Sequence, residues 1–246
     1  GADTDVGPGA TECNCPTGSD WNKYVETCEP PSCDTYVDCP ASANYVACVE
    51  HLCKEYIPVE YIQSDGTQYF DTGVTGNQDT EITVTAARID SNGYYKYSQL
   101  AGWFKTGSNE SITINVNNTD YNNGVCRFNG IASSQGAAKV FHANPGHAIT
   151  YSISRNGMVQ GNATVDTFSG VGTFTTSSTL CLLKSCGTSG TERPWRLYGA
   201  QFTNTQPTDR DFKPVKDEDG KGCLYDVVTH EPLYHLGGGT MGIGEF

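Results

Sequence analysis

Cysteines crowd the first part of this chain, and that crowding limits what the part can fold into. Seven of the eleven cysteines lie within the first 53 residues, a stretch too short to stabilise itself by apolar burial alone. The stretch has no C-x-x-C pair and His51 is its one histidine, so it lacks the ligand pattern of a structural zinc site. We therefore predict a small disulfide-stapled module over residues 13–55, made in an oxidising compartment outside the cytoplasm.

The odd number of cysteines prevents complete pairing within one chain. At least one thiol is therefore free, blocked or bonded to another molecule. Because the module's own seven cysteines are also an odd number, we expect one of them to bond a later cysteine, for instance Cys223 or Cys126. Cys181 and Cys186 either close a small loop or leave a free Cys181 buried on a strand. The cysteines that we predict to form disulfides are Cys13, Cys15, Cys28, Cys33, Cys39, Cys48, Cys53 and Cys223.

Two segments at the ends of the module carry separate expectations. Residues 1–12 have no apolar periodicity and contain three glycines and a proline, which predicts a flexible arm unless a neighbouring subunit orders it. Residues 44–56 fit either a short helix or a strand tied by Cys48 and Cys53.

No run of about 18 apolar residues is present in the chain, so we expect no membrane span. No basic and apolar leader is present either, so a signal peptide of an exported protein is expected to have been removed.

Short alternating segments follow the module, and they predict an all-β domain. In residues 81–86, Ile82, Val84 and Ala86 share one face of a strand, and similar segments recur with polar turns between them. The Asn156-Gly157 pair predicts a hairpin with a type I′ turn. About a dozen short strands with little helix predict two packed antiparallel sheets.

Residues 56–73 read YIPVEYIQSDGTQYFDTG, which predicts two strands joined by a tight turn at residues 64–67. This stretch closely resembles the opening of the concanavalin A-like, laminin G-like jelly-roll domains of bacterial surface and phage-related proteins. The end of the chain, residues 210–246, resembles the final strands of the same family. The resemblance covers about residues 56–246 and implies a concanavalin A-like antiparallel β-sandwich with an adhesive or lectin-like role outside the cell. It implies no universal site residues, and a fold alone does not determine function.

The charge of the chain limits its partners. Lysine and arginine total 15 against 28 aspartate and glutamate, which gives a net charge of −13. Nucleic-acid binding depends on basic groups that neutralise phosphates, so we expect no nucleic-acid partner. The acidity fits solubility and mutual repulsion between molecules.

Motifs for catalysis and cofactor binding are missing from the sequence. It contains no E-x-D-x-x-E run of the kind that suits a sandwich-fold glycoside hydrolase, and no G-x-S-x-G, phosphate-binding loop or dinucleotide fingerprint. We therefore expect a protein that is not an enzyme and has no cofactor. Residues 217–220 suit a hairpin turn, with a calcium loop as the weaker alternative. We interpret His142, His147, His230 and His235 as turn residues, so we expect no metal site.

Aromatic side chains are the candidate ligand-binding residues, because their apolar faces and polar rims suit stacking on sugar rings. Since side chains alternate along a strand, Tyr95 and Tyr97 should share one side of a sheet. Ordinary core packing is the competing interpretation for part of the set. The candidates are Tyr95, Tyr97, Trp103, Tyr121 and Trp195.

Asn109, Asn117 and Asn162 each begin an N-glycosylation sequon, whose use depends on the source of the protein.

The composition, the cysteine pattern and the family resemblance together predict a secreted or surface-displayed, non-enzymatic protein that binds a glycan or an extracellular protein. The alternative is a structural subunit of an extracellular filament or pilus, a homopolymer assembled through the N-terminal arm or by strand exchange. A polysaccharide-active enzyme is the third hypothesis.

Overall fold

The fold is known from a computed structural model, which divides the chain into two compact units, Gly1–Ile57 and Pro58–Phe246. The predicted N-terminal arm, residues 1–12, lies outside the residues that the structure describes. These are residues 20–22, 27–29, 33–40, 42–89, 97–105, 110–117, 126–132, 141–143, 145–187 and 193–246. Among them no helix is long and apolar enough to cross a membrane.

The described residues of the first unit form two small hairpins and one short helical turn. Strands β1 (Asp20–Asn22) and β2 (Thr27–Glu29) pair antiparallel, and the 3-10 turn η1 covers Tyr36–Asp38. Strands β3 (Tyr45–Val49) and β4 (Leu52–Pro58) form the second hairpin. Of the two interpretations of residues 44–56, the strand is therefore the one confirmed.

The second unit confirms the all-β prediction, since its described residues contain strands and no α-helix. The strand pairs formed by these described residues are antiparallel except β12 with β9, which is parallel. The strands are β5 (Tyr61–Ser64), β6 (Phe70–Asp71), β7 (Glu81–Arg88), β8 (Tyr97–Trp103), β9 (Ile112–Asn117), β10 (Arg127–Phe128), β11 (Ile131–Ala132), β12 (Phe141–His142), β13 (Ile149–Ser154), β14 (Gly157–Gln160), β15 (Ala163–Asp166), β16 (Cys181–Leu182), β17 (Trp195–Thr203), β18 (Arg210–Lys216), β19 (Gly222–Asp226), β20 (Glu231–Leu233) and β21 (Gly242–Gly244).

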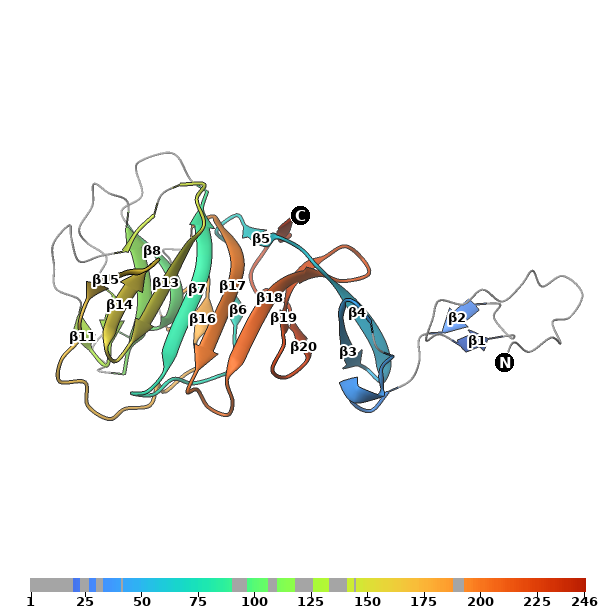
Figure 1. The fold of residues 1–246 in the computed structure, drawn as a ribbon, viewed down its shortest axis with the longest axis horizontal. Coiled ribbons are helices and arrows are strands. Elements are labelled where there is room, and N and C mark those ends of the chain that lie inside the picture. The colour runs from blue at the N-terminus through green and yellow to red at the C-terminus, as the bar shows by residue number, and fades with distance from the viewer. Residues whose placement is uncertain are drawn as a thin grey trace, which may run out of the picture. The chain divides into compact units, whose positions relative to one another are not determined.

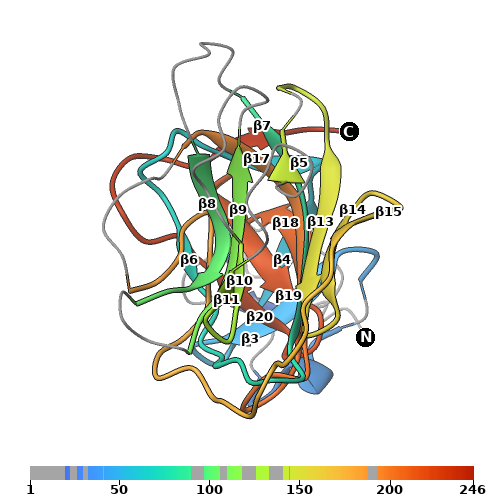
Figure 2. The same cartoon turned by 90° about the vertical axis from the view of Figure 1, so that its left-hand side faces the viewer.

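These strands form two sheets with an apolar core between them. The larger sheet runs β15-β14-β13-β7-β17-β18-β19-β20 (Figure 1), with β5 paired to β17 and β21 paired to β5. The smaller sheet runs β11-β10-β9-β8-β16-β6. Figure 2 shows β8 and β9 on one side of this unit and β13 and β14 on the other. Ile82, Val84 and Ala86, predicted to share one face of a strand, are all fully buried and belong to the core.

The two strands predicted within residues 56–73 do not pair with each other, so the predicted hairpin is wrong. Strand β5 pairs with β17 and β21 of the larger sheet, whereas β6 pairs with β16 of the smaller one. The tight turn between them is held by buried side chains instead of a strand ladder. Ser64 Oγ accepts the Gly66 N–H at 3.0 Å, and Gln68 Oε1 accepts the Asp65 N–H at 2.9 Å. The segment therefore carries the chain from one sheet to the other.

The hairpin predicted at Asn156-Gly157 is confirmed, but its turn type is wrong. Ser154 pairs with Gly157, so Arg155 and Asn156 form the turn, and neither has the positive φ that a type I′ turn requires. Gly157 itself has a φ of 139°, and a Cβ there would lie 2.1 Å from the carbonyl oxygen of Asp166. Close approach of the neighbouring strand is thus the reason for this glycine.

One hydrogen bond joins the two sheets through the core. Trp195 of β17 is fully buried, and its indole Nε1–H donates to Ser98 Oγ of β8 at 2.8 Å. Ser98 is also fully buried, so no water competes for either group. A buried donor without an acceptor is costly, and this bond therefore favours one relative placement of β17 and β8.

We expect Ser98→Ala to lower the free energy of unfolding by about 1 to 3 kcal/mol, because it leaves the buried indole N–H of Trp195 without an acceptor. Denaturant unfolding of Ser98→Ala, Trp195→Phe and the double variant gives the coupling energy of the pair. A coupling energy near zero would contradict the role given to this bond.

Candidate ligand-binding surface

The two tryptophans predicted to bind ligand lie in the core, so that prediction is wrong for both. Trp103 is 2% exposed and Trp195 is fully buried. Trp103 pairs with Ile112 across β8 and β9, on the face turned to the other sheet. Tyr97 pairs with Asn117 on the same two strands, but its side chain lies outside the described residues.

Tyr95 and Tyr121, the remaining predicted ligand-binding residues, also lie outside the part of the chain that the structure describes. A different cluster of aromatic side chains lies partly exposed on the outer face of the larger sheet, where a ligand can reach it. We call it the Tyr-Arg surface, and it consists of Tyr61, Gln63, Arg196 and Tyr198, all half-buried.

Neighbouring strands hold the Tyr-Arg surface together. Gln63 of β5 lies opposite Arg196 of β17, and the Arg196 Nε–H donates to Gln63 Oε1 at 3.0 Å. The guanidinium carbon of Arg196 lies 4.7 Å from the centre of the Tyr61 ring, a cation–π contact. The Tyr61 and Tyr198 rings have centres 5.5 Å apart and are tilted by 57°. The four side chains therefore form one contiguous patch of two rings, one cation and one amide.

A break in the pairing of β17 with β7 places Tyr198 in this patch. Leu197 pairs with Ala86 and Gly199 with Thr85, so Tyr198 has no partner on β7. Before the break odd-numbered residues such as Leu197 are buried, and after it even-numbered ones such as Ala200 are. The irregularity has the effect of a β-bulge, which re-aims a side chain while both flanking segments keep their apolar faces inward.

Strand β21 borders the patch with two glycines. Gly242 pairs with Gln63 and Gly244 with Tyr61, so both positions face the patch without a side chain. A Cβ on Gly244 would lie 2.2 Å from atoms of the Tyr61 ring, so this ring rests on the Gly244 backbone. Ile243 between the glycines packs against the core. Glycine within a strand often marks such a close approach.

The chemistry of the patch suits binding and offers little for catalysis. Tyrosine rings supply apolar faces with polar rims, and arginine supplies a planar fork of N–H donors. The four side chains include no carboxylate, imidazole or thiol to act as a general acid or base near neutral pH. In the sequence, Tyr61 falls within the predicted strands of residues 56–73, and no motif distinguishes Arg196 or Tyr198. The alternation of side chains along a strand does place Tyr61 and Gln63 on the same face, and this is the part of the patch that the sequence could have indicated.

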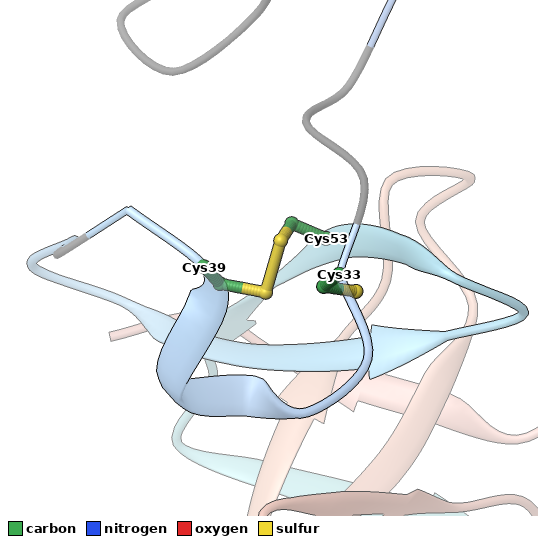
Figure 3. Close-up of side chains that lie close together, drawn as sticks. All are labelled: Cys33, Cys39 and Cys53. Atoms are coloured by element: carbon green, nitrogen blue, oxygen red, sulfur yellow. A yellow bond between two sulfur atoms is a disulfide. The ribbon is translucent and has the colours of Figure 1, made fainter.

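In the first unit, the four cysteines whose side chains the structure describes form two adjacent disulfides, Cys33–Cys48 and Cys39–Cys53. Cys48 and Cys53 lie opposite each other on β3 and β4, yet each bonds a cysteine from the preceding segment. Figure 3 shows Cys33 beside the Cys39–Cys53 bond, and the sulfur atoms of these three lie within 4.8 Å of one another. Because all of these sulfurs are in disulfides, they are not thiolate ligands for a metal ion. The predicted disulfide state of these four cysteines is confirmed.

The side chains of Cys13, Cys15 and Cys28 lie outside the described residues, so their predicted disulfides are not seen. In the second unit, Cys181 and Cys186 form a disulfide, which is the small-loop alternative.

Cys223 is a free thiol, so its predicted disulfide is wrong. All residues of its strand β19 are buried, and Cys223 itself is fully buried. Burial raises the pKa of the Cys223 thiol to about 12, with the nearby Asp217 carboxylate adding to the shift. Cys126 is also free and buried, and desolvation raises its pKa to about 12 as well. Cys126 belongs to the apolar core, where its thiol also donates to the backbone carbonyl of Asn115 at 3.3 Å.

We expect iodoacetamide at about pH 8 to leave Cys126 and Cys223 unmodified in the native protein, because burial blocks access and a raised pKa leaves almost no thiolate. In denaturant without a reductant both should react, as peptide mass spectrometry can measure. Cys181 is the internal control, since it should react only after reduction. Alkylation of either free thiol in the native protein would contradict their burial.

The predicted turn at residues 217–220 is confirmed between β18 and β19. Asp217 Oδ1 accepts the backbone N–H groups of Lys221 at 2.8 Å and Asp219 at 3.2 Å, and Asp217 Oδ2 accepts the Tyr234 hydroxyl. The Asp217 carboxylate therefore stabilises the turn by accepting backbone hydrogen bonds. His230 also lies in a turn, where its Nδ1 is 3.2 Å from the Tyr225 hydroxyl.

Of the remaining histidines, His147 is exposed and His235 is half-buried, while the side chain of His142 lies outside the described residues. Asn162 is exposed in the turn between β14 and β15. Asn109 and the side chain of Asn117 lie outside the described part of the chain, so two of the three sequons are not placed.

Comparison with protein-family models, with curated proteins and with solved structures gives no match to this chain. The interpretation of the Tyr-Arg surface therefore depends on its own chemistry.

Proposed function

We propose that this protein is a secreted or surface-displayed recognition protein that binds a glycan without catalysis. In this proposal residues 56–246 are a concanavalin A-like jelly roll, and the first unit is an extracellular stapled module. The antiparallel two-sheet arrangement of the second unit is compatible with a jelly roll. Three disulfides among the described cysteines support an oxidising compartment.

The observation that carries the proposal is the Tyr-Arg surface. Tyr61 and Tyr198 place two rings 5.5 Å apart on a strand-borne, half-exposed face. A sugar ring has apolar C–H faces and hydroxyls at its rim, so it can stack on tyrosine while its hydroxyls reach neighbouring polar groups. Gln63 and Arg196 supply those polar groups within the same patch. Because β5 and β17 are well paired, the patch is already ordered before a ligand arrives.

We expect Tyr198→Ala to weaken glycan binding by roughly tenfold or more, since one stacking face is lost from the patch. A glycan array followed by calorimetry on the strongest hit measures the effect. Val159→Ala is a matched control, because Val159 is an exposed side chain on β14 elsewhere in the same sheet. If folded protein binds no glycan, or both variants bind equally, the Tyr-Arg surface is not a glycan site.

A second candidate function is a disulfide-linked filament subunit, and the cysteine count favours it. Three disulfides hold six of the eleven cysteines, and Cys126 and Cys223 are free. That leaves Cys13, Cys15 and Cys28, an odd number that cannot pair completely among themselves. At least one of these three thus has no partner within the chain, and a second copy can supply one.

If copies are linked in this way, full-length protein from an oxidising compartment should form a ladder on non-reducing gels after thiols are blocked at harvest. Single serine substitutions of Cys13, Cys15 and Cys28 should include one that collapses the ladder, while Cys126→Ser leaves it intact. A uniform monomer on the gel and by negative-stain microscopy would exclude the disulfide-linked filament.

A further inference from the structure

The polar groups that the Tyr-Arg surface presents outward are mainly hydrogen-bond donors. Arg196 uses its Nε–H on Gln63 Oε1, which leaves the two terminal nitrogens of the guanidinium without a hydrogen-bond acceptor among the described residues. The same bond settles the orientation of the Gln63 amide, because its oxygen accepts from Arg196. The NH2 group of Gln63 is therefore the end that faces away from Arg196. A donor-rich patch favours a ligand rich in acceptors.

Arg196 also differs from several other cations of the described residues in having no carboxylate partner. Arg155 pairs with Asp79 at 2.9 Å, and Lys213 pairs with Asp211 at 2.8 Å. Arg196 instead contacts the Tyr61 ring and the neutral Gln63 amide. In a chain with a net charge of −13, carboxylates are plentiful, yet none within the described ranges forms an ion pair with this half-exposed arginine. The positive charge of Arg196 is therefore available to an anionic group of a ligand.

We propose that the Tyr-Arg surface binds a saccharide that carries a carboxylate, that is, a uronic acid unit of an acidic polysaccharide. Arg196 binds the carboxylate through its planar fork, which matches the two oxygens of that group. Tyr61 and Tyr198 contact the pyranose ring that bears the carboxylate, and the Gln63 amide donates to a ring or carboxylate oxygen. The inference depends on the proposed glycan-binding function and names the class of glycan.

Polygalacturonate and its fully methyl-esterified form are suitable probes, because they share one backbone and differ in the carboxylate charge. We expect affinity electrophoresis and calorimetry in about 0.15 M salt to show binding of the acid at least roughly tenfold tighter than binding of the ester. A sulfated galactan is the third probe, since sulfate supplies charge without the planar pair of oxygens. Binding of the sulfated galactan alone would overturn the assignment to a carboxylate.

Substitutions within the patch distinguish the contribution of the planar guanidinium geometry of Arg196 from that of its positive charge. Gln63→Glu keeps the size of the side chain and places a carboxylate against Arg196, so binding of polygalacturonate should fall by roughly tenfold or more. Arg196→Lys keeps the charge but loses the fork, and it should weaken binding of the acid without affecting the ester. Arg196→Gln should behave like Gln63→Glu. The matched control is Arg155→Gln, which changes the net charge equally at the β13–β14 turn.

The outcomes distinguish this inference from the proposed function. Equal binding of acid and ester overturns the uronic acid assignment while glycan binding stands. No binding of any saccharide by folded protein, as judged by circular dichroism, overturns both. A loss of binding in Arg155→Gln as large as in Arg196→Gln overturns the assignment as well, because it would show that only overall charge matters.

Discussion

The apolar contact between the two sheets is the interaction on which the second unit depends. Fully buried side chains from both sheets, such as Ile82 of β7 and Ile114 of β9, exclude water from the space between them. Inside this dry core the indole of Trp195 has Ser98 as its hydrogen-bond acceptor. A shift of either strand would leave that donor buried and unsatisfied, which links the placement of β17 to that of β8.

Strand β17 connects this core to the Tyr-Arg surface. Trp195 and Leu197 point inward, so Arg196 between them must point outward, because side chains alternate along a strand. A slip of one residue in the register of β17 would exchange these roles and bury a charge. The irregular pairing at Tyr198 then lets Phe202 return to the core. The outer patch is thus a consequence of how the inner face is packed.

Much of the architecture follows from short-range patterns in the sequence. Alternation at residues 81–86 predicted β7 and its buried face, and the cysteine density predicted that Cys33, Cys39, Cys48 and Cys53 are in disulfides, although not which of them pair. The hairpin at β13 and β14 was also predictable from its turn residues, although the turn type was not. By contrast, the Trp103 and Trp195 predictions failed because alternation separates two faces without saying which face is covered by another sheet.

The sequence by itself determined the fold class, the disulfide state of Cys33, Cys39, Cys48 and Cys53, and the net negative charge, since all three depend on composition and local spacing. Only the tertiary structure decided that β5 and β6 belong to different sheets and that Tyr61 and Arg196, 135 positions apart, lie side by side. Such contacts depend on which strands pair across long loops. That pairing is set by burial and register throughout the core, which no local pattern contains.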